Sequence, residues 1–215
     1  MTDTQTLIDR LSGDTALPRA LRSPRYWVVR VLAVLAVYGV AAQLFLGLRP
    51  DLIMQFTRPL FGIEIGLLTG LLLTSVLASI LAMYPDACQK PKLLKLPHIT
   101  LLLLAGFMGF QLFMPLGGRL VMPQPGAHAM DCAICIGAVA LIPSAFIFAL
   151  LRKGASVCQL QAGSFAVLAA TTIGCLTLRL AEPNDSIIHL VSWHYLPTLL
   201  FAALGAFIGK YLLRW

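Results

Sequence analysis

The chain has 215 residues, of which 59% are hydrophobic and only 12% are charged, and its mean hydropathy is +0.85. Soluble domains carry about a quarter of their residues as charged side chains, so these values exclude an ordinary soluble protein. The formal net charge is +7, but the positive side chains stand in short clusters beside apolar runs. That distribution is typical of a membrane protein and argues against direct nucleic-acid binding. We therefore expect an all-α integral membrane protein with about six spans of roughly 20 residues each.

The first 26 residues form a long polar segment, which we interpret as a cytoplasmic tail ahead of a transmembrane domain over residues 27–215. Apolar residues at helical spacing and a basic run that leads toward the bilayer make this tail the candidate partner-binding segment. An apolar stripe on a helix can dock in a groove of a partner protein. The alternative is a helix that lies on the membrane and contacts lipid headgroups through its basic residues. The candidate residues are Leu7, Ile8, Leu11, Arg19 and Arg22.

Six apolar runs follow, and each is long enough to cross the hydrocarbon core as a helix, with short loops between them. An even number of spans places both termini on one side of the membrane. Twelve of the 16 Lys and Arg residues fall on that side, so the positive-inside rule predicts cytoplasmic termini. The runs cover approximately Trp27–Leu48, Leu60–Met83, Ile99–Pro115, Cys132–Leu151, Val157–Leu178 and Leu190–Leu213.

Glu64 lies inside the second run, about one turn from its outer end. A carboxylate within a span is costly, so we expect a polar or basic partner close to it. Arg58 is six residues away and would lie on a different face of the same helix. Two interpretations of Glu64 stay open, namely a lock that holds spans together and a signalling or proton-linked role.

Several small residues are interpreted as packing positions within the bundle, in preference to a face for dimerisation. Glycines four residues apart share one helix face and allow neighbouring helices to approach closely. They occur in the second and sixth runs, as Gly62, Gly66, Gly70, Gly205 and Gly209. Three of the five cysteines are also interpreted as packing residues: Cys88, Cys158 and Cys175.

Cys132 and Cys135 begin the fourth run in the outer-facing sequence DCAIC, and His128 lies just before them. Two thiols separated by two residues can close a disulfide or bind a soft metal, and His128 can add a ligand. A single C-x-x-C is a weak signal, and Cys135 also fits a small buried hydrophobe. The three are candidate sensing residues, and Cys132 and His128 are the metal candidates. The other histidines are interpreted as interfacial polar groups: His98, His189 and His194.

No serine-hydrolase, zincin, P-loop or dinucleotide motif occurs, so we expect no cofactor and no enzyme of those classes. Two other functions stay open. One is a membrane thiol oxidoreductase that uses Cys132 and Cys135. The other is a small transporter, for which Glu64 is the only clear intramembrane charge.

Sequence stretches along nearly the whole chain are similar to one family. They are LIDRL and LPRALRSPRYW in the tail, RPDL before the second run, HAMDC and LIPSAFIFALLRKGA around the fourth, and SWHYLPTLLFAALGAFIGKYLLRW at the end. In these stretches the chain resembles the NrsF-type negative regulators of extracytoplasmic-function (ECF) sigma factors.

The resemblance implies a non-catalytic anti-sigma factor of the bacterial inner membrane. Its cytoplasmic face would sequester an ECF sigma factor and release it on an envelope, metal or oxidative stress signal. The resemblance also implies two outer-facing cysteines. Cys132 matches the first, whereas the second would fall near Ala181–Glu182, where this chain has none.

Overall fold

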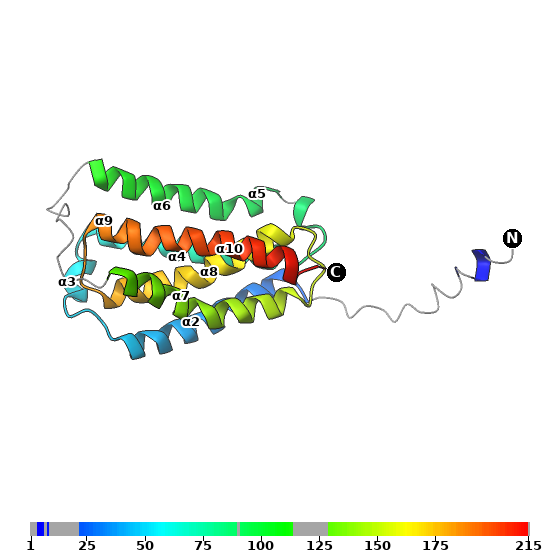
Figure 1. The fold of residues 1–215 in the computed structure, drawn as a ribbon, viewed down its shortest axis with the longest axis horizontal. Coiled ribbons are helices and arrows are strands. Elements are labelled where there is room, and N and C mark those ends of the chain that lie inside the picture. Colours follow the sequence, from blue (N-terminus) through cyan, green and yellow to red (C-terminus); the bar gives the residue numbers. More distant parts are fainter. Residues whose placement is uncertain (1–3, 7, 9–21, 90, 114–128, 215) are drawn as a thin grey trace.

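The structure is a computed structural model that describes residues 4–6, 8, 22–89, 91–113 and 129–214. The described residues form a helical bundle without strands (Figure 1). Its elements are α2 (Pro24–Leu46), α3 (Leu52–Phe56), α4 (Pro59–Leu81), the 3-10 helix η1 (Ala87–Gln89), α5 (Pro91–Leu94), α6 (Leu96–Phe113), α7 (Ala129–Leu151), α8 (Gln159–Ala181), α9 (Ile187–His189), the π-helix η3 (Leu190–Tyr195) and α10 (Leu196–Leu212).

Six helical segments of the described chain are long and apolar enough to cross a membrane, which confirms the predicted number of spans. Prolines explain some of the starts, since a proline at the first helical position loses no hydrogen bond and has the right φ. Pro24 and Pro59 begin α2 and α4 in this way. The spans are Pro24–Leu46, Pro59–Leu81, Pro91–Phe113, Met130–Leu151, Gln159–Ala181 and Ile187–Leu212.

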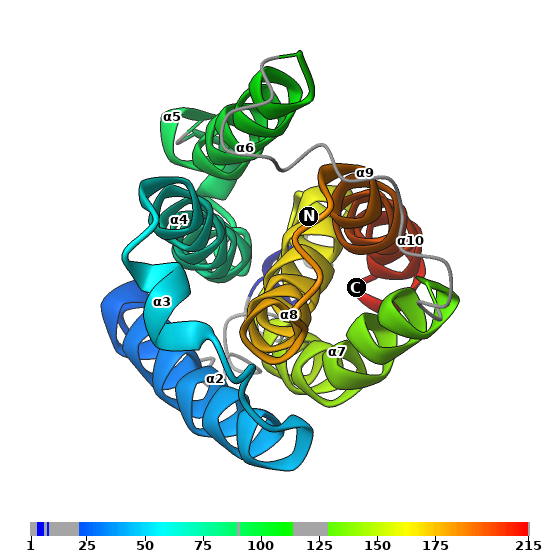
Figure 2. The same ribbon diagram turned by 90° about the vertical axis from the view of Figure 1, so that its left-hand side faces the viewer.

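Helix α8 is the centre of the bundle, with α2, α4, α7 and α10 packed around it (Figure 2). Within the most apolar window of α8, 78% of the residues are buried, against 11% for α2. Small side chains allow this central position, because they let neighbouring helices approach from several sides. They are Ala162, Gly163, Ala166, Ala169, Ala170 and Gly174.

The closest helix contact joins α8 to α10, and it confirms the packing role predicted for Gly205 and Gly209. A Cβ atom built on Gly205 would lie 2.7 Å from the carbonyl oxygen of Gly163, and one on Gly209 would lie 2.8 Å from the Cα of Gly163. The same prediction is wrong for Gly62 and Gly66. Both are exposed and would have no atom within 4 Å of an added Cβ, because α4 turns its opposite face toward α8.

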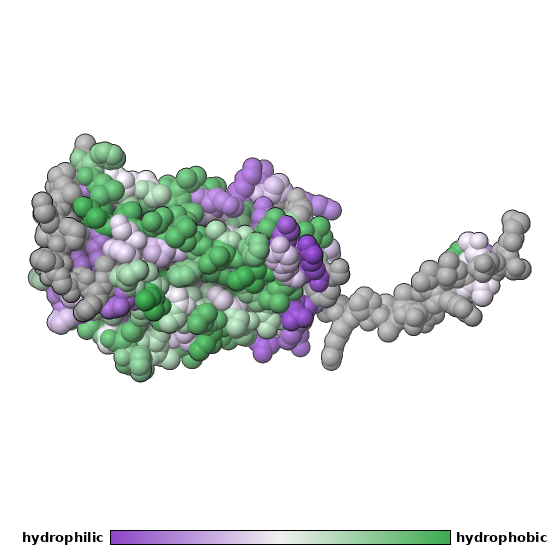
Figure 3. All heavy atoms as spheres, viewed as in Figure 1, coloured by the Kyte–Doolittle hydropathy of each residue, from purple (hydrophilic) through white to green (hydrophobic). Residues whose placement is uncertain are grey.

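The two ends of the bundle differ in charge. Helix α2 begins at the end where α10 finishes (Figure 1), and there the Tyr84 hydroxyl donates a hydrogen bond to the carbonyl oxygen of Arg22. Figure 3 shows hydrophilic residues gathered at this end, beyond an apolar middle. We call it the basic end, defined by the exposed residues Arg22, Arg25, Lys92, Lys95, Arg152, Lys153, Lys210 and Arg214.

Candidate functional site

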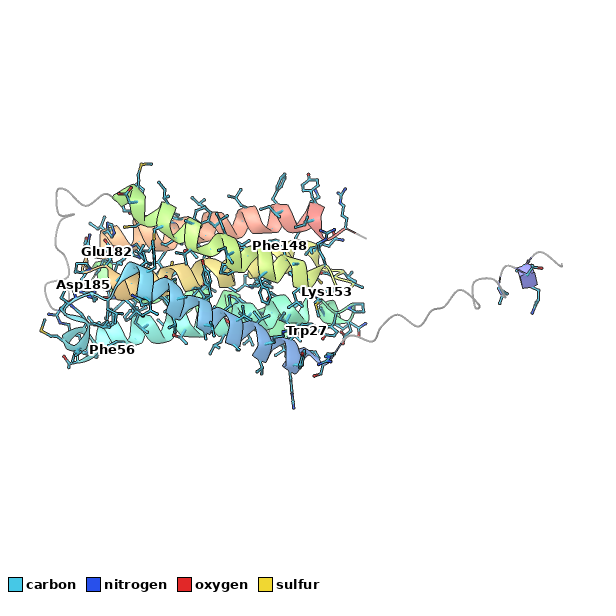
Figure 4. All side chains as sticks on the ribbon, turned by 90° about the horizontal axis from the view of Figure 1, so that it is seen from below. Trp27, Phe56, Phe148, Lys153, Glu182 and Asp185 are labelled. Atoms are coloured by element: carbon cyan, nitrogen blue, oxygen red, sulfur yellow. The ribbon has the colours of Figure 1, made fainter. Side chains whose placement is uncertain are left out.

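The charged side chains that are buried gather at the end of the bundle opposite the basic end, together with some of the buried polar ones. Figure 4 labels Glu182 and Asp185 there, beside Phe56 of α3, whereas Trp27 and Lys153 lie at the other end. The residues come from the loop that carries α3, from the turns of α4 and α8 at this end, and from the segment 182–195. Two neighbouring groups can be distinguished by their contacts.

The first group is built on Glu64 of α4 and Arg179 of α8, which are 0% and 1% exposed. The Arg179 guanidinium donates two hydrogen bonds to the Glu64 carboxylate, from Nε to Oε1 at 2.8 Å and from Nη2 to Oε2 at 3.3 Å. The Tyr195 hydroxyl donates to Glu64 Oε1 at 2.5 Å. Phe61 packs its ring 5.1 Å from the guanidinium carbon of Arg179. Glu64 is therefore paired and shielded from lipid.

The second arginine of this group, Arg49, extends the pairing to the loop before α4. Its side chain donates to Asp51 at 2.7 Å and to Asp185 at 3.0 Å, while Arg179 donates to Asp185 at 2.7 Å. Gln55 of α3 donates to both aspartates, at 2.8 and 2.9 Å. We call this set the ion-pair network: Arg49, Asp51, Gln55, Glu64, Arg179, Asp185 and Tyr195.

The ion-pair network keeps its aspartates ionised. Burial alone would raise the pKa of Asp185, but hydrogen bonds from Arg49 and Arg179 outweigh it, and the pKa lies below its ordinary value. Hydrogen bonds from Arg49 and Gln55 hold the pKa of Asp51 well below its ordinary value. The network thus ties α4, α8 and the loop of α3 together through ion pairs in which both arginines and Glu64 are buried.

The predicted partner of Glu64 exists, and it is Arg179, 115 residues away in sequence. Arg58 is exposed and lies outside the network, in agreement with its expected position on another helix face. Of the two interpretations of Glu64, the geometry favours the lock between spans.

The second group surrounds Cys132 near the start of α7. Its thiol lies 3.4 Å from Glu182 Oε2 and 3.5 Å from His189 Nε2. The Glu182 carboxylate also contacts both imidazoles, at 3.1 Å for His189 Nε2 and 3.0 Å for His194 Nε2. Ligand-type atoms of all four side chains lie within 4.8 Å of one another. We call this set the Cys132 cluster.

A local irregularity of the last span brings the two histidines of the Cys132 cluster together. Residues five apart on an α-helix point about 140° away from each other. Between His189 and His194, however, the chain follows the π-helix η3, whose i→i+5 hydrogen bonds place residues five apart on nearly the same side. The two rings are 5.4 Å apart between centroids, and the residues are 4% and 1% exposed. Interpreting them as interfacial polar groups is therefore wrong.

Glu182 supplies the negative charge of the Cys132 cluster. Burial tends to raise the pKa of this carboxyl, but the hydrogen bond from His194 and the charges of both histidines outweigh it, so the pKa lies below its ordinary value. Glu182 also occupies the position near which the family resemblance places a second cysteine. Its contact with Cys132 shows that the two positions adjoin in the fold.

The cysteines divide into separate environments. Among those whose side chains are described, Cys132, Cys135 and Cys175 carry free thiols, and Cys158 is disulfide-bonded. Cys175 is buried in α8 and lies 3.0 Å from Thr198 Oγ1, which confirms its packing role, whereas the packing role predicted for Cys158 is wrong. Cys135 is partly buried one helical turn beyond Cys132, and its sensing role stays a prediction.

Several candidate residues fall outside the described part of the chain, namely Leu7, Leu11, Arg19 and His128. Ile8 is described, and it is helical and 52% exposed. Arg22 lies exposed at the basic end. Sequence reasoning missed Glu182, His189 and His194 as neighbours of Cys132. The stretch EPNDSIIHLVSWH could have indicated them, because it holds several residues of metal-ligand type and begins where the family resemblance places a second cysteine.

Comparison with known proteins identifies one family. A family model described as NrsF, negative regulator of sigma F, matches residues 11–215. The match includes all six spans, the ion-pair network and the Cys132 cluster. No curated protein and no solved structure matches the chain.

Proposed function

We propose, since this chain belongs to the NrsF family of negative regulators of sigma F, that it is an anti-sigma factor that holds an ECF sigma factor at the cytoplasmic face of the bacterial inner membrane. It releases the sigma factor when a stress signal acts on the opposite end of the bundle. The observation that carries this proposal is the family match over residues 11–215. The family description is that of a regulator, in line with a non-catalytic role.

The charge distribution supports a cytoplasmic basic end. Among the described residues, the exposed Lys and Arg side chains of the loops gather mainly at that end, whereas Arg49 and Arg179 at the other end are buried in pairs with carboxylates. Cytoplasmic loops of membrane proteins carry the excess of Lys and Arg. This orientation places the Cys132 cluster and the ion-pair network on the outer side.

The N-terminal segment is the proposed sigma-binding element. The carbonyl oxygen of Arg22 accepts a hydrogen bond from Tyr84, so the point where this segment joins α2 is held at the basic end. Ile8 is helical and half exposed, which suits an apolar side chain that docks in a groove of a partner. Leu7 and Leu11 complete the proposed apolar stripe, and Arg19 and Arg22 flank it with positive charge.

The test is co-purification of the detergent-solubilised protein with its candidate ECF sigma factor, as the full chain and as a chain that lacks residues 1–20. We expect the full chain to retain the sigma factor and the shortened chain to lose it. Because residues 1–20 precede every span, the shortened chain should still insert in the membrane, and the amount of protein in the membrane fraction checks this.

A matched pair of variants locates the contact within the segment. Replacing Leu7, Ile8 and Leu11 together with serine should release the sigma factor. Replacing Gln5 and Thr6 with serine alters exposed polar positions of the same stretch and should leave it bound. If the full chain retains no sigma factor, or if the shortened chain and the triple variant retain as much as the full chain, the proposed binding element is wrong.

A further inference from the structure

We infer that the Cys132 cluster is a binding site for one divalent d-block cation of the zinc type, with Cys132, Glu182, His189 and His194 as the four ligands. The site follows from the positions of these side chains and does not depend on the proposed sigma-binding role.

The donor set matches the chemistry of such a cation. Zinc is bound by thiolate sulfur, imidazole nitrogen and carboxylate oxygen, most often in fours and with tetrahedral geometry. Here one thiol, one carboxylate and two imidazoles converge, and both imidazoles are almost fully buried. A thiolate and a carboxylate together carry two negative charges, which neutralise a divalent cation. The occupied site would therefore carry no net charge, as its burial demands.

Four of the six distances between donor atoms lie close to the edges of a tetrahedron around a metal. Zinc bonds of about 2.0 Å to nitrogen or oxygen and about 2.3 Å to sulfur give tetrahedral edges of about 3.3 Å between N and O and about 3.5 Å between S and either atom. The corresponding distances in the structure are 3.0 and 3.1 Å from Glu182 oxygens to the two Nε2 atoms, and 3.4 and 3.5 Å from the thiol. The two remaining donor pairs lie within 4.8 Å.

The backbone supports the same conclusion. π-Helical segments are rare and are frequently found at functional sites. Here the π-helix η3 runs over Leu190–Tyr195 and turns His189 and His194 toward one carboxylate. A regular α-helix would cross the membrane equally well and would keep all of its backbone hydrogen bonds in the ordinary pattern. The irregularity has a ready explanation if the two rings serve one ligand.

Occupancy of the site would join three parts of the chain. Cys132 lies near the start of α7, Glu182 follows α8, and the two histidines belong to the final span. Figure 4 shows Glu182 at this end of the bundle, close to Asp185 of the ion-pair network. A cation bound there would fasten α7 to the last span on the side remote from the basic end, and coordination would release the proton of the Cys132 thiol to solvent.

The test uses the full chain, purified in detergent with an affinity tag that contains no histidine, stripped with a chelator and dialysed. We expect about one zinc ion per chain to be retained after incubation with zinc and renewed dialysis, measured by elemental analysis. Cobalt(II) in place of zinc should give the intense visible absorption of a tetrahedral complex and a near-ultraviolet charge-transfer band from the thiolate.

Variants assign the ligands. Cys132→Ser should abolish the charge-transfer band, and His194→Gln should weaken zinc binding by about 100-fold or more, since even residues that only support metal ligands matter by 10–100-fold. The matched control is His98→Gln, because His98 is exposed and belongs to α6 at the basic end. Circular dichroism of each variant checks that the helices are retained.

Two results would overturn the site. The first is a wild-type chain that retains no zinc and gives no tetrahedral cobalt spectrum, a measurement that needs no variant to fold. The second is zinc retention that is equal in Cys132→Ser, His194→Gln and the wild type. Neither result bears on sigma-factor retention, so failure of the metal site and failure of the proposed function are distinguishable.

Discussion

Arg179→Met tests whether the ion-pair network holds together the end of the bundle opposite the basic end. Arg179 and Glu64 lie 2.8 Å apart with side chains that are 1% and 0% exposed. At an effective dielectric constant of about 20, their attraction is about 6 kcal/mol before desolvation is counted. Removal of Arg179 leaves Glu64 buried without its counter-charge and removes one of the two arginines that contact Asp185. Breaking a buried pair in this way costs about 3–5 kcal/mol, and we expect the free energy of unfolding to fall by that amount.

The assay is reversible unfolding of the purified protein in mixed micelles with increasing sodium dodecyl sulfate, followed by circular dichroism. Arg58→Met is the matched control, since Arg58 is an exposed arginine at the start of α4, and it should change the free energy of unfolding by no more than about 0.5 kcal/mol. The double variant Arg179→Met, Glu64→Leu replaces the pair with apolar side chains. It should recover most of the loss, because the unpaired buried carboxylate is gone.

An Arg179→Met protein as stable as Arg58→Met would show that the buried pair does not hold this end of the bundle together. The same conclusion would follow if the double variant lost the sum of the two single losses, since the cost would then lie in packing rather than in an unpaired charge.

Two further predictions concern the packing and the pH response of the bundle. Gly205→Val should lower the free energy of unfolding by about 1–3 kcal/mol, because a Cβ there would lie 2.5 Å from Val167 Cγ2. The control Gly66→Val adds a Cβ with no atom within 4 Å and should leave the unfolding midpoint nearly unchanged. Equal midpoints for the two variants would contradict the close α8–α10 contact. The pKa of Asp185 lies below its ordinary value of 3.8, so the unfolded chain binds the proton more readily and stability rises with pH in this range. The contribution of Asp185 is thus present above about pH 4 and lost as the pH falls further. Asp185→Asn should flatten that loss in acid unfolding curves, and parallel curves for variant and wild type would speak against the pairing of Asp185 with the two arginines.

For the Glu64–Arg179 pair, the sequence predicted that a partner exists but not which residue it is. That a carboxylate inside a span needs a partner follows from the cost of a charge in hydrocarbon, and this part of the prediction is confirmed. The sequence did not predict which residue is the partner, because Arg179 is 115 residues away. An arginine at the end of a span is equally typical of a side chain that anchors the helix at the membrane interface.

The glycines show the same limit. Gly62 and Gly66 have the spacing of a packing face, as do Gly205 and Gly209, but only the second pair contacts a neighbouring helix. In a bilayer the side of a helix that faces lipid is as apolar as the side that faces protein. Periodicity therefore does not reveal which face is turned inward, and the central position of α8 was not predictable either.

Local sequence predicts six segments that are long and apolar enough to cross a membrane, where each of them approximately begins and ends, and that positive charge collects on the side of the termini. These features follow from local composition, since a helix of about 20 apolar residues, whose backbone groups hydrogen-bond within the helix, is enough to cross the bilayer. Only the tertiary structure decided which buried charges meet and that Cys132 lies against Glu182, His189 and His194. The physical reason is that these contacts join different helices, and that the π-helix between the histidines has no signature in the order of the residues.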